Sequence, residues 1–275
     1  MSKSTNTSMR AEPSQRVQSS RRAKRPIDVG APLPDDVIAT INPELPKAAQ
    51  IYEVIRHAIV SLALKPGAII NEKEICDRLG TSRTPFREAI LKLNNEHLVT
   101  IVPNSGTYVA KINLQDVFDG QLIRDALELR AVRFAASRMT PEFERDLDFN
   151  VYQQKRFAAE KNYDRFYLLD EQFHFLICSF GTSERVWQVV HEAKAQLDRI
   201  RRLAFPTDNH MNIVLAEHLE VFEALKARDP DLAVEAMSRH LRRVFRTIRM
   251  LLDEDSEYFH EGAVDMLKEY ELAIP

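Results

Sequence analysis

Glycine is scarce in this chain, and this scarcity constrains the possible folds more than any other feature of the sequence. Only 7 of the 275 residues are glycine, whereas a usual share of about 7% would give roughly 19. The chain contains neither Gly-x-Gly-x-x-Gly nor Gly-x-x-x-x-Gly-Lys, which excludes nucleotide-phosphate loops built on glycine. All-β folds with many tight turns are also disfavoured, because such turns need positive φ angles. We therefore expect a mostly helical protein.

Cysteine usage and hydropathy narrow the class further. Cys76 and Cys178 lie far apart in the sequence, which argues against a disulfide framework and against a cysteine zinc cluster. No stretch approaches 18 consecutive apolar residues, and residues 1–30 lack the apolar core of a secretory signal. We expect a cytoplasmic protein that makes no use of a membrane.

Charge is distributed unevenly along the chain. The formal net charge is −3, but residues 1–30 contain seven basic and two acidic residues and residues 47–111 contain nine and six. The part from residue 112 onward carries a net charge of −8. This asymmetry favours a nucleic-acid-binding N-terminal part attached to an acidic body, although charged runs can also be simple solvated faces. Residues 1–46 are rich in Ser, Thr, Arg and Pro, which predicts a disordered basic tail.

Residues 47–111 have the pattern of a winged helix-turn-helix. Three helices are predicted from apolar spacing and caps, over about 47–62, 71–80 and 83–95. Asn71 and Ser82 are good N-cap residues for the second and third of these helices. Two β-rich runs flank a turn at 103–106 and predict a hairpin. Helices joined by a short glycine-containing turn and followed by a hairpin form a winged helix.

The third predicted helix carries candidate DNA-contacting residues. Arg83 and Arg87 are four residues apart and therefore project from one face. Ser82 and Thr84 lie at the N-terminal end of the helix, which is the end that enters the major groove. Arginine side chains suit guanine edges or phosphates, and small hydroxyls suit phosphates. Taken alone, the two arginines could also be a solvated pair beside Glu88.

Several short runs in this segment are specific when they occur together: Leu64-Lys65-Pro66-Gly67, Asn71-Glu72-Lys73-Glu74, Leu79-Gly80, Ser82 to Ala89, Leu93, Leu98 and Gly106-Thr107-Tyr108-Val109. In these runs the chain closely resembles the GntR family of bacterial transcription regulators. The resemblance implies contacts to operator DNA from four helix residues, Lys73, Arg83, Thr84 and Arg87. It also implies that the wing tip, Ser105 and Gly106, lies near the minor groove. Lys73 stands where relatives usually carry Arg, and His97 stands where they usually have Gly.

From residue 114 onward the sequence has almost no strand signal. Helical periods cut by Pro and Gly predict six helices, over about 115–138, 141–160, 163–180, 183–203, 211–227 and 230–252. Long helices joined by short loops favour an antiparallel bundle. The expected organisation is a basic tail, a winged helix-turn-helix domain, an all-helical domain and a C-terminal tail, over 1–46, 47–111, 114–252 and 253–275.

Three histidines on separate predicted helices of this bundle are candidate metal ligands. His174, His218 and His240 each lie on an apolar face, where a lone histidine is usually a core residue. Three such faces together are a different case, because metal sites are built in bundle cores from facing helices and imidazole is the commonest ligand. Completed by a carboxylate, the set suits zinc first, with nickel, manganese or iron as alternatives.

Further runs in the bundle form a second recognisable pattern: Arg124-Asp125-Ala126-Leu127-Glu128, Ala135-Ala136, Asp170-x-x-Phe173-His174, Glu217-His218 and His240-Leu241. They look like the FCD effector domain of the FadR-like branch of the GntR family, and the resemblance covers about residues 48–245. It implies a divalent ion held by the three histidines and one aspartate, with a small carboxylate effector near the ion. We take Asp125 as that aspartate, and keep Asp170 as the alternative, either as a ligand or as a partner that orients His174.

The effector is expected to contact Arg124 and Thr182. Arg124 and Glu128 could form an ordinary intrahelical ion pair, or Arg124 could bind an effector carboxylate. Thr182 stands where relatives often have Asn, which leaves the identity of the effector open.

The expected function is a ligand-responsive transcription regulator that binds operator DNA as a homodimer and is not an enzyme. Most members of the family repress transcription, and the sequence does not give the sign for this chain. The alternatives are a metalloenzyme with an accessory DNA-binding-like domain, and a DNA-binding protein with a metal-free bundle.

Overall fold

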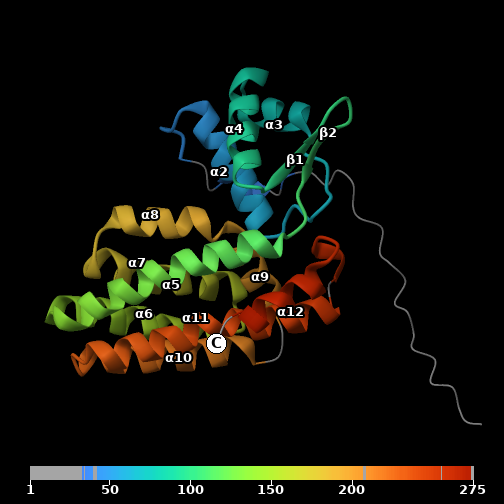
Figure 1. Ribbon diagram of the computed structural model, residues 1–275. Helices are drawn as coiled ribbons and strands as arrows, with labels where there is room; N and C mark the ends of the chain where they lie inside the picture. Colours follow the sequence, from blue (N-terminus) through green and yellow to red (C-terminus); the bar gives the residue numbers. More distant parts are fainter. Residues whose placement is uncertain (1–32, 34, 40–41, 207–208, 255, 274–275) are drawn as a thin grey trace, which may run out of the picture.

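The computed structural model describes residues 33, 35–39, 42–206, 209–254 and 256–273. A small part built from three helices and a hairpin lies on top of a layered set of long helices (Figure 1). The mostly helical fold class, with an N-terminal winged helix-turn-helix and a C-terminal helical bundle, is therefore confirmed. The first 32 residues of the predicted basic tail lie outside the described residues.

The winged helix-turn-helix has the elements that the sequence predicts. They are α2 (Lys47–Val60), α3 (Glu72–Leu79), α4 (Arg83–Asn95), β1 (Val99–Val102) and β2 (Gly106–Val109). The Asn71 side chain accepts a hydrogen bond from the backbone N–H of Glu74 at 3.1 Å and so caps α3. Gly80 ends this helix with a left-handed φ of 58°, which glycine adopts at no steric cost. The strands are antiparallel, with Val99 opposite Val109 and Val102 opposite Gly106.

The core of this part is apolar and comes mainly from one face of α2. Ile51, Ile55 and Ile59 of α2 are fully buried, and residues of α3, α4 and the hairpin cover them. A short helix, α1 (Asp35–Ala39), lies within the predicted tail and packs on α2, where it buries Val37. Part of the predicted tail thus belongs to this apolar core.

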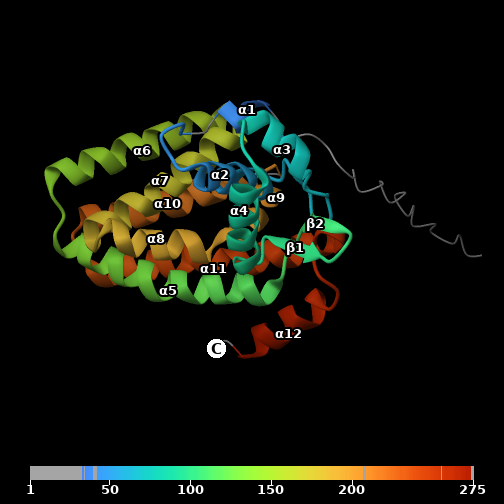
Figure 2. The ribbon, with the colours of Figure 1, turned by 90° about the horizontal axis from the view of Figure 1, so that it is seen from above.

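The second part is a bundle of long helices. Its elements are α5 (Leu114–Ser137), α6 (Pro141–Ala159), α7 (Tyr163–Gly181), α8 (Glu184–Ala193), α9 (Ala195–Ala204), α10 (His210–Lys226) and α11 (Pro230–Glu254). Helix α5 packs against α7 and α11, α6 packs against α7 and α10, and α10 packs against α11. Helices α8 and α9 lie on the side of this ring that faces the winged helix (Figure 1), and α9 contacts α2, which is seen beside it from above (Figure 2). Gly181 allows α7 to approach α5 closely, since a Cβ atom there would lie 2.1 Å from the Ala131 carbonyl oxygen.

The predicted single helix over 183–203 is wrong, because the chain forms two helices there. The break is at Lys194, whose backbone leaves the helical region with φ −96° and ψ 8°. The side chain of Lys194 is buried, and its Nζ donates to Glu171 at 2.5 Å and to Asp198 at 2.7 Å. The contact with Glu171 is tertiary and has no local sequence signal, and Lys194 and Asp198 have the i,i+4 spacing that a continuous helix also gives. Helical periodicity alone therefore predicts one helix across the break.

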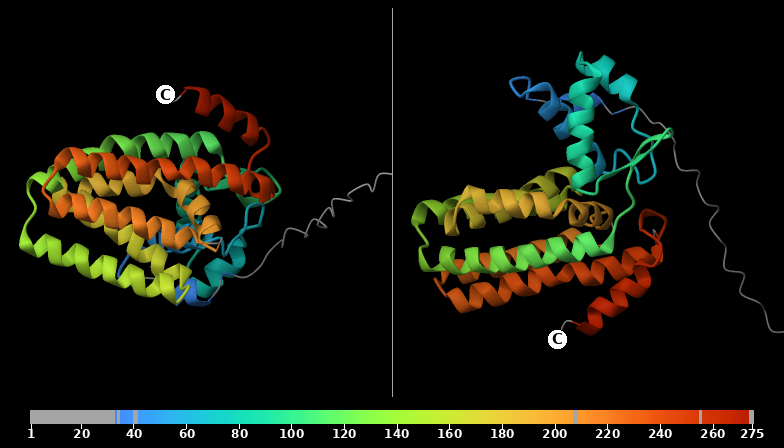
Figure 3. Two further views of the ribbon diagram at one scale, coloured as in Figure 1. Left: turned by 90° about the horizontal axis from the view of Figure 1, so that it is seen from below. Right: turned by 45° about the horizontal axis from the view of Figure 1, so that its top comes forward.

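The last part of the chain returns to the joint between the two domains. A 3-10 turn (Ser256–Tyr258) and α12 (Ala263–Ala273) follow α11, and α12 lies beside α5 and α11 at one corner of the bundle (Figure 3). The backbone N–H of Ile112, in the linker before α5, donates to the Tyr258 carbonyl at 2.8 Å. His260 donates in return to the Ile112 carbonyl at 3.0 Å. No helix in the described part of the chain is both long and apolar enough to cross a bilayer.

Candidate functional site

The residues predicted to contact DNA lie on the surface of α3 and α4. Lys73, Ser82, Arg83, Thr84 and Arg87 are all exposed. The N-terminal end of α4 points away from the bundle (Figure 1). The Arg83 side chain is 79% exposed, and its Nε lies 3.3 Å from Glu72 Oε1. The surface is therefore free to approach a duplex, and no ion pair within the described residues fixes Arg87.

The wing and the turn before it contain residues with left-handed backbone. Gly106 has φ 146° at the tip, and the neighbouring Ser105 hydroxyl lies 2.7 Å from the Tyr108 hydroxyl. His97 has φ 55°, which explains why glycine is suited to this position. The His97 carbonyl accepts a hydrogen bond from Gln196 Nε2 at 2.7 Å, and its Nδ1 lies 2.9 Å from Asp116 Oδ1. The turn before the wing is thus held by residues of α9 and α5.

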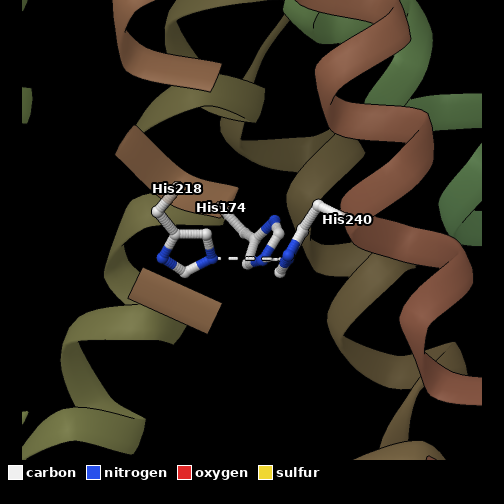
Figure 4. Close-up of side chains that lie close together, drawn as sticks. All are labelled: His174, His218 and His240. Atoms are coloured by element: carbon white, nitrogen blue, oxygen red, sulfur yellow. Dashed lines mark hydrogen bonds between the residues drawn. The ribbon is translucent and has the colours of Figure 1, made fainter. Parts of the chain in front are cut away.

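The three predicted metal ligands converge at one point in the bundle. His174, His218 and His240 come from α7, α10 and α11, and all three side chains are buried. Their imidazole nitrogens face one another (Figure 4). His240 Nε2 lies 3.1 Å from His174 Nε2 and 3.3 Å from His218 Nε2.

The proton of His174 lies on the nitrogen that points away from this cluster. Its Nδ1 is 2.6 Å from Glu128 Oε2, and Arg124 Nε donates to the other oxygen of Glu128 at 2.6 Å. Burial alone would raise the pKa of Glu128, but Arg124 and His174 outweigh it and hold this pKa well below its usual range. Glu128 is therefore an ionised acceptor, and His174 Nδ1 donates to it. With the ring proton on Nδ1, the Nε2 atom of His174 is the nitrogen that faces the cluster.

A chain of amides assigns the proton of His218 in the same way. The backbone carbonyl of Leu169 can only accept, so the Asn150 amide nitrogen faces it at 3.0 Å and the Asn150 oxygen faces Gln154. Gln154 Nε2 donates to that oxygen at 2.7 Å, which turns Gln154 Oε1 toward His218 Nδ1 at 2.8 Å. His218 Nδ1 therefore carries the proton, and Nε2 has a lone pair.

His240 completes the set. Its Nδ1 lies 3.1 Å from Glu217 Oε2, while Arg243 Nε donates to Glu217 Oε1 at 2.7 Å. Burial and the neighbouring imidazoles hold the pKa of His218 and of His240 well below the usual value, so these two rings are neutral. The three Nε2 atoms thus face each other, with that of His240 3.1 Å from His174 and 3.3 Å from His218, and no proton lies between the neutral rings of His218 and His240.

This donor set fits a divalent transition metal. Two nitrogens bound to one ion at 2.0–2.1 Å lie about 2.8–3.4 Å apart for angles between the octahedral and tetrahedral values. The observed separations of 3.1 and 3.3 Å fall in this range. Each imidazole also donates its other N–H to an oxygen acceptor, which is the arrangement found around most metal-bound histidines.

The structure brings Asp170 to this cluster and does not bring Asp125. Asp170 is buried one helical turn before His174, and its Oδ1 lies 3.6 Å from His218 Nε2. Asp125 instead accepts a hydrogen bond from Gln121 Nε2 at 2.8 Å, and partial burial raises its pKa. The reason is helical phase, since Asp125 is one residue beyond Arg124 and therefore turned about 100° away from the cluster. Asp170 replaces Asp125 as the candidate carboxylate.

A cavity of about 40 Å³ lies against the histidine cluster. Arg124, Arg201 and Arg243 line it together with His240 and Asp170. Burial and the nearby Arg124 lower the pKa of Arg201 to about 10, and Arg201 pairs with Asp170. Three guanidinium groups around one small cavity favour an anionic ligand.

Thr182, the other predicted effector residue, is not among the residues that line this cavity. Its hydroxyl donates to the Cys178 carbonyl at 2.7 Å at the end of α7. Sequence reasoning missed Gln154, Glu217 and Arg201 as functional candidates. Glu217 adjoins His218 in the recognised run, but nothing in the local sequence links Gln154 or Arg201 to the histidines.

Helix α9 connects the cavity with the winged helix. Leu197 and Arg201 of α9 line the cavity. On its other side, Arg199 Nη2 donates to the Ala110 carbonyl at 2.8 Å, and Gln196 donates to His97. Further contact comes from Arg56 of α2, which donates to the carbonyl of a residue in α8 at 3.1 Å. The two domains are therefore joined by polar contacts that begin at the cavity wall.

Comparisons with known proteins agree with this architecture. The profile of the bacterial regulatory proteins of the gntR family matches residues 47–109, and that of the FCD domain matches residues 121–243. The HTH-type transcriptional repressor RspR of Escherichia coli (strain K12) is 36% identical over 221 residues, which are 80% of this chain and 97% of that protein. The Nta operon transcriptional regulator of Aminobacter aminovorans is 30% identical over 190 residues, or 69% of this chain and 88% of that protein. The solved structure of E. coli McbR/YncC has the same fold, with a TM-score of 0.63 and 20% identity over 72% of this chain and 95% of that one.

Proposed function

The chain belongs to the gntR family of bacterial regulatory proteins and carries an FCD domain, and from this premise we propose that it is a metal-dependent, carboxylate-responsive regulator that binds operator DNA as a homodimer. Residues 47–111 form the DNA-binding domain in this proposal, and residues 114–252 bind the effector and dimerise. The relatives are named transcriptional regulators, so we infer a regulatory rather than a catalytic role.

One observation carries the metal part of the proposal: three buried imidazoles turn their Nε2 atoms toward one another, while each Nδ1 faces an oxygen acceptor, so that with the proton on each Nδ1 the Nε2 lone pairs face each other. Such an arrangement is repulsive by itself, and a cation removes the repulsion. His174, His218 and His240 would hold the ion, with Asp170 as a fourth protein ligand. Zinc is the first expectation for three nitrogens and one carboxylate, and nickel, manganese or iron can also use such a set.

The effector part rests on the charge of the cavity. A bound divalent ion is a Lewis acid that attracts a carboxylate oxygen. Arg124 is buried beside the cluster, with Nη2 at 3.4 Å from His174 Nε2, and can share its remaining donors with a bound carboxylate. Arg201 and Arg243 add further donors on the other walls of the cavity.

Binding is coupled to DNA affinity through α9. A ligand that rearranges Arg201 moves the helix that also carries Gln196 and Arg199, which bond to the winged helix at His97 and Ala110. Such coupling requires that the effector bind one arrangement of the domains better than the other. A dimer is proposed because one winged helix reads too few base pairs for a specific site. The contacting residues would be Lys73, Ser82, Arg83, Thr84, Arg87 and the wing tip at Ser105 and Gly106.

Metal analysis combined with an operator-binding assay tests the proposal. We expect freshly purified protein to contain about one divalent ion per chain, and chelation to lower its thermal stability. An ion present at a hundredfold excess over its Kd stabilises the folded state by about 2.7 kcal/mol. His218→Ala should abolish this difference, and the response of operator binding to small carboxylic acids should disappear with it. The metal assignment is contradicted if the freshly purified native protein contains no divalent metal and the His218→Ala variant still responds to carboxylates.

A further inference from the structure

A basic groove of about 590 Å³ lies between α10 and α11. These two helices lie on the face of the bundle opposite the winged helix (Figure 3, left). Four arginines of α11 line it, at spacings of three and four residues that put them on one helix face: Arg239, Arg242, Arg243 and Arg246. Glu217 and Glu220 are the acidic residues among the lining residues. The lining residues of the groove therefore carry a net charge of +2.

The four arginines are not equivalent. Arg239 pairs with Glu220 at 2.9 Å and with Glu235 at 2.7 Å, and Arg243 pairs with Glu217. Arg242 and Arg246 are exposed, and neither forms a hydrogen bond or an ion pair with any residue that the structure describes. Two guanidinium groups one helical turn apart thus face the groove with all their donors available.

The groove adjoins the small cavity at the histidine cluster. Arg243 lines both spaces, and the Arg243–Glu217 ion pair forms the wall between them. Glu217 is also the acceptor for His240 Nδ1 at 3.1 Å. An anion that competes with Glu217 for Arg243 therefore acts directly on a residue that orients one of the imidazoles.

Size shows why both spaces are needed. The inner cavity has a volume of about 40 Å³. Small-molecule sites usually measure about 300–1,000 Å³. A ligand of ordinary size must therefore extend past Arg243 into the groove, where Arg242 and Arg246 can bind a second anionic group.

We propose that the effector is a carboxylic acid with a second anionic group, a carboxylate or a phosphate. Its first carboxylate lies in the inner cavity with Arg124 and Arg201, and its second anionic group is bound in the groove by Arg242 and Arg246. This inference rests on the proposed carboxylate-binding function and specifies the chemical class that the site selects. Recognition at two separated points makes the site reject monocarboxylates.

Calorimetric titration of the metal-loaded full chain tests this inference. The probes are glutarate and 3-phosphonopropionate, which carry two anionic groups, and butyrate, which carries one. We expect at least tenfold tighter binding of the two doubly anionic probes than of butyrate. In the Arg242→Gln/Arg246→Gln double variant this ratio should fall to below threefold, while butyrate affinity stays within twofold of the native value. Comparison of the two doubly anionic probes distinguishes a second carboxylate from a phosphate.

Control variants separate this inference from the proposed function. Arg185→Gln removes an exposed arginine of α8 outside the groove and should change neither the affinity for butyrate nor that for the doubly anionic probes. Arg246→Lys should restore part of the preference for the doubly anionic probes. An undiminished preference in the double variant, or equal binding of butyrate and glutarate to native protein, overturns the groove assignment and leaves the proposed function intact. If no carboxylate binds the metal-loaded protein, the proposed function itself fails and this inference fails with it.

Discussion

The two functional regions of this molecule are built in opposite ways. The candidate DNA-contacting residues lie on the surface of α3 and α4, and Arg83 and Glu72 form the ion pair there that joins the two helices. The candidate metal ligands are buried, and each is oriented by an acceptor from another helix, namely Glu128, Gln154 and Glu217. The first region keeps its function separate from its folding, whereas the second uses the same contacts for both. Mutations at the buried site should therefore lower the free energy of unfolding, whereas mutations on the DNA-binding face should lower DNA affinity and leave stability unchanged.

The largest effect is expected at Glu128. Glu128→Ala leaves the Arg124 guanidinium buried without its carboxylate and removes the acceptor of His174. Removal of one partner of a buried ion pair typically costs about 3–5 kcal/mol. We expect a loss of this size in the free energy of unfolding measured with urea. Glu88→Ala, on the exposed face of α4, should change stability by less than about 0.5 kcal/mol, and similar losses for both variants would remove the contrast between the regions.

The next effect is expected on the DNA-binding face and should leave stability unchanged. Arg87→Ala removes an exposed side chain that no described residue holds in place. If Arg87 contacts a base edge, operator affinity should fall by about 1–3 kcal/mol with relaxed specificity at one position. Fluorescence anisotropy with selected operator duplexes measures the affinity, and urea denaturation checks that stability stays the same. An Arg87→Ala protein that binds its operator with native affinity at moderate salt contradicts the assignment of this helix.

A smaller effect is expected where a buried residue acts only through its neighbour. Gln154→Leu removes the acceptor that fixes His218 and should weaken metal binding about 10–100-fold. Competition with a chromophoric chelator measures the change, and Gln154→Glu, which keeps an acceptor oxygen at this position, should restore much of the affinity. Equal affinities for native protein and Gln154→Leu would show that the amide chain does not orient the ligand.

The smallest effect is expected at Lys73. Lys73 is exposed on α3 and is assigned to a phosphate rather than to a base. Lys73→Gln should weaken binding to all duplexes about equally and reduce the slope of log K against log salt by about one. A titration series over salt concentrations measures this slope, and a loss confined to one operator sequence would assign Lys73 to base recognition.

The same contrast explains how much could be predicted from the sequence. The winged helix is predictable because its signals are local: the Asn71 cap, the turn at Gly80 and the hairpin turn all act within a few residues. The histidines are predictable as a set because they lie on the apolar faces of separate helices. The choice between Asp125 and Asp170 needs the rotation of α5 against α7, which is set by packing and not by spacing.

The break at Lys194 and the role of Gln154 show the same limit. Lys194 lies at the break after α8, and its ammonium group is buried against Glu171 of α7, 23 residues earlier in the chain. Gln154 is separated from His218 by 64 residues. Helical periodicity reports which face of a helix is buried but not which side chain lies opposite.

The buried Arg199 has a consequence for the exchange of domains between proteins. Its guanidinium has no carboxylate partner among the described residues and donates to the Ala110 carbonyl and to Gln196, and burial lowers its pKa to about 9. A recombinant chimera that receives a foreign DNA-binding domain joined at residue 111 still has a backbone carbonyl at position 110, but the buried cation is satisfied only if that carbonyl lies at the same place. A viable exchange of domains must therefore keep the backbone path at this joint, transfer α9 together with the DNA-binding domain, or replace Arg199 by an uncharged residue.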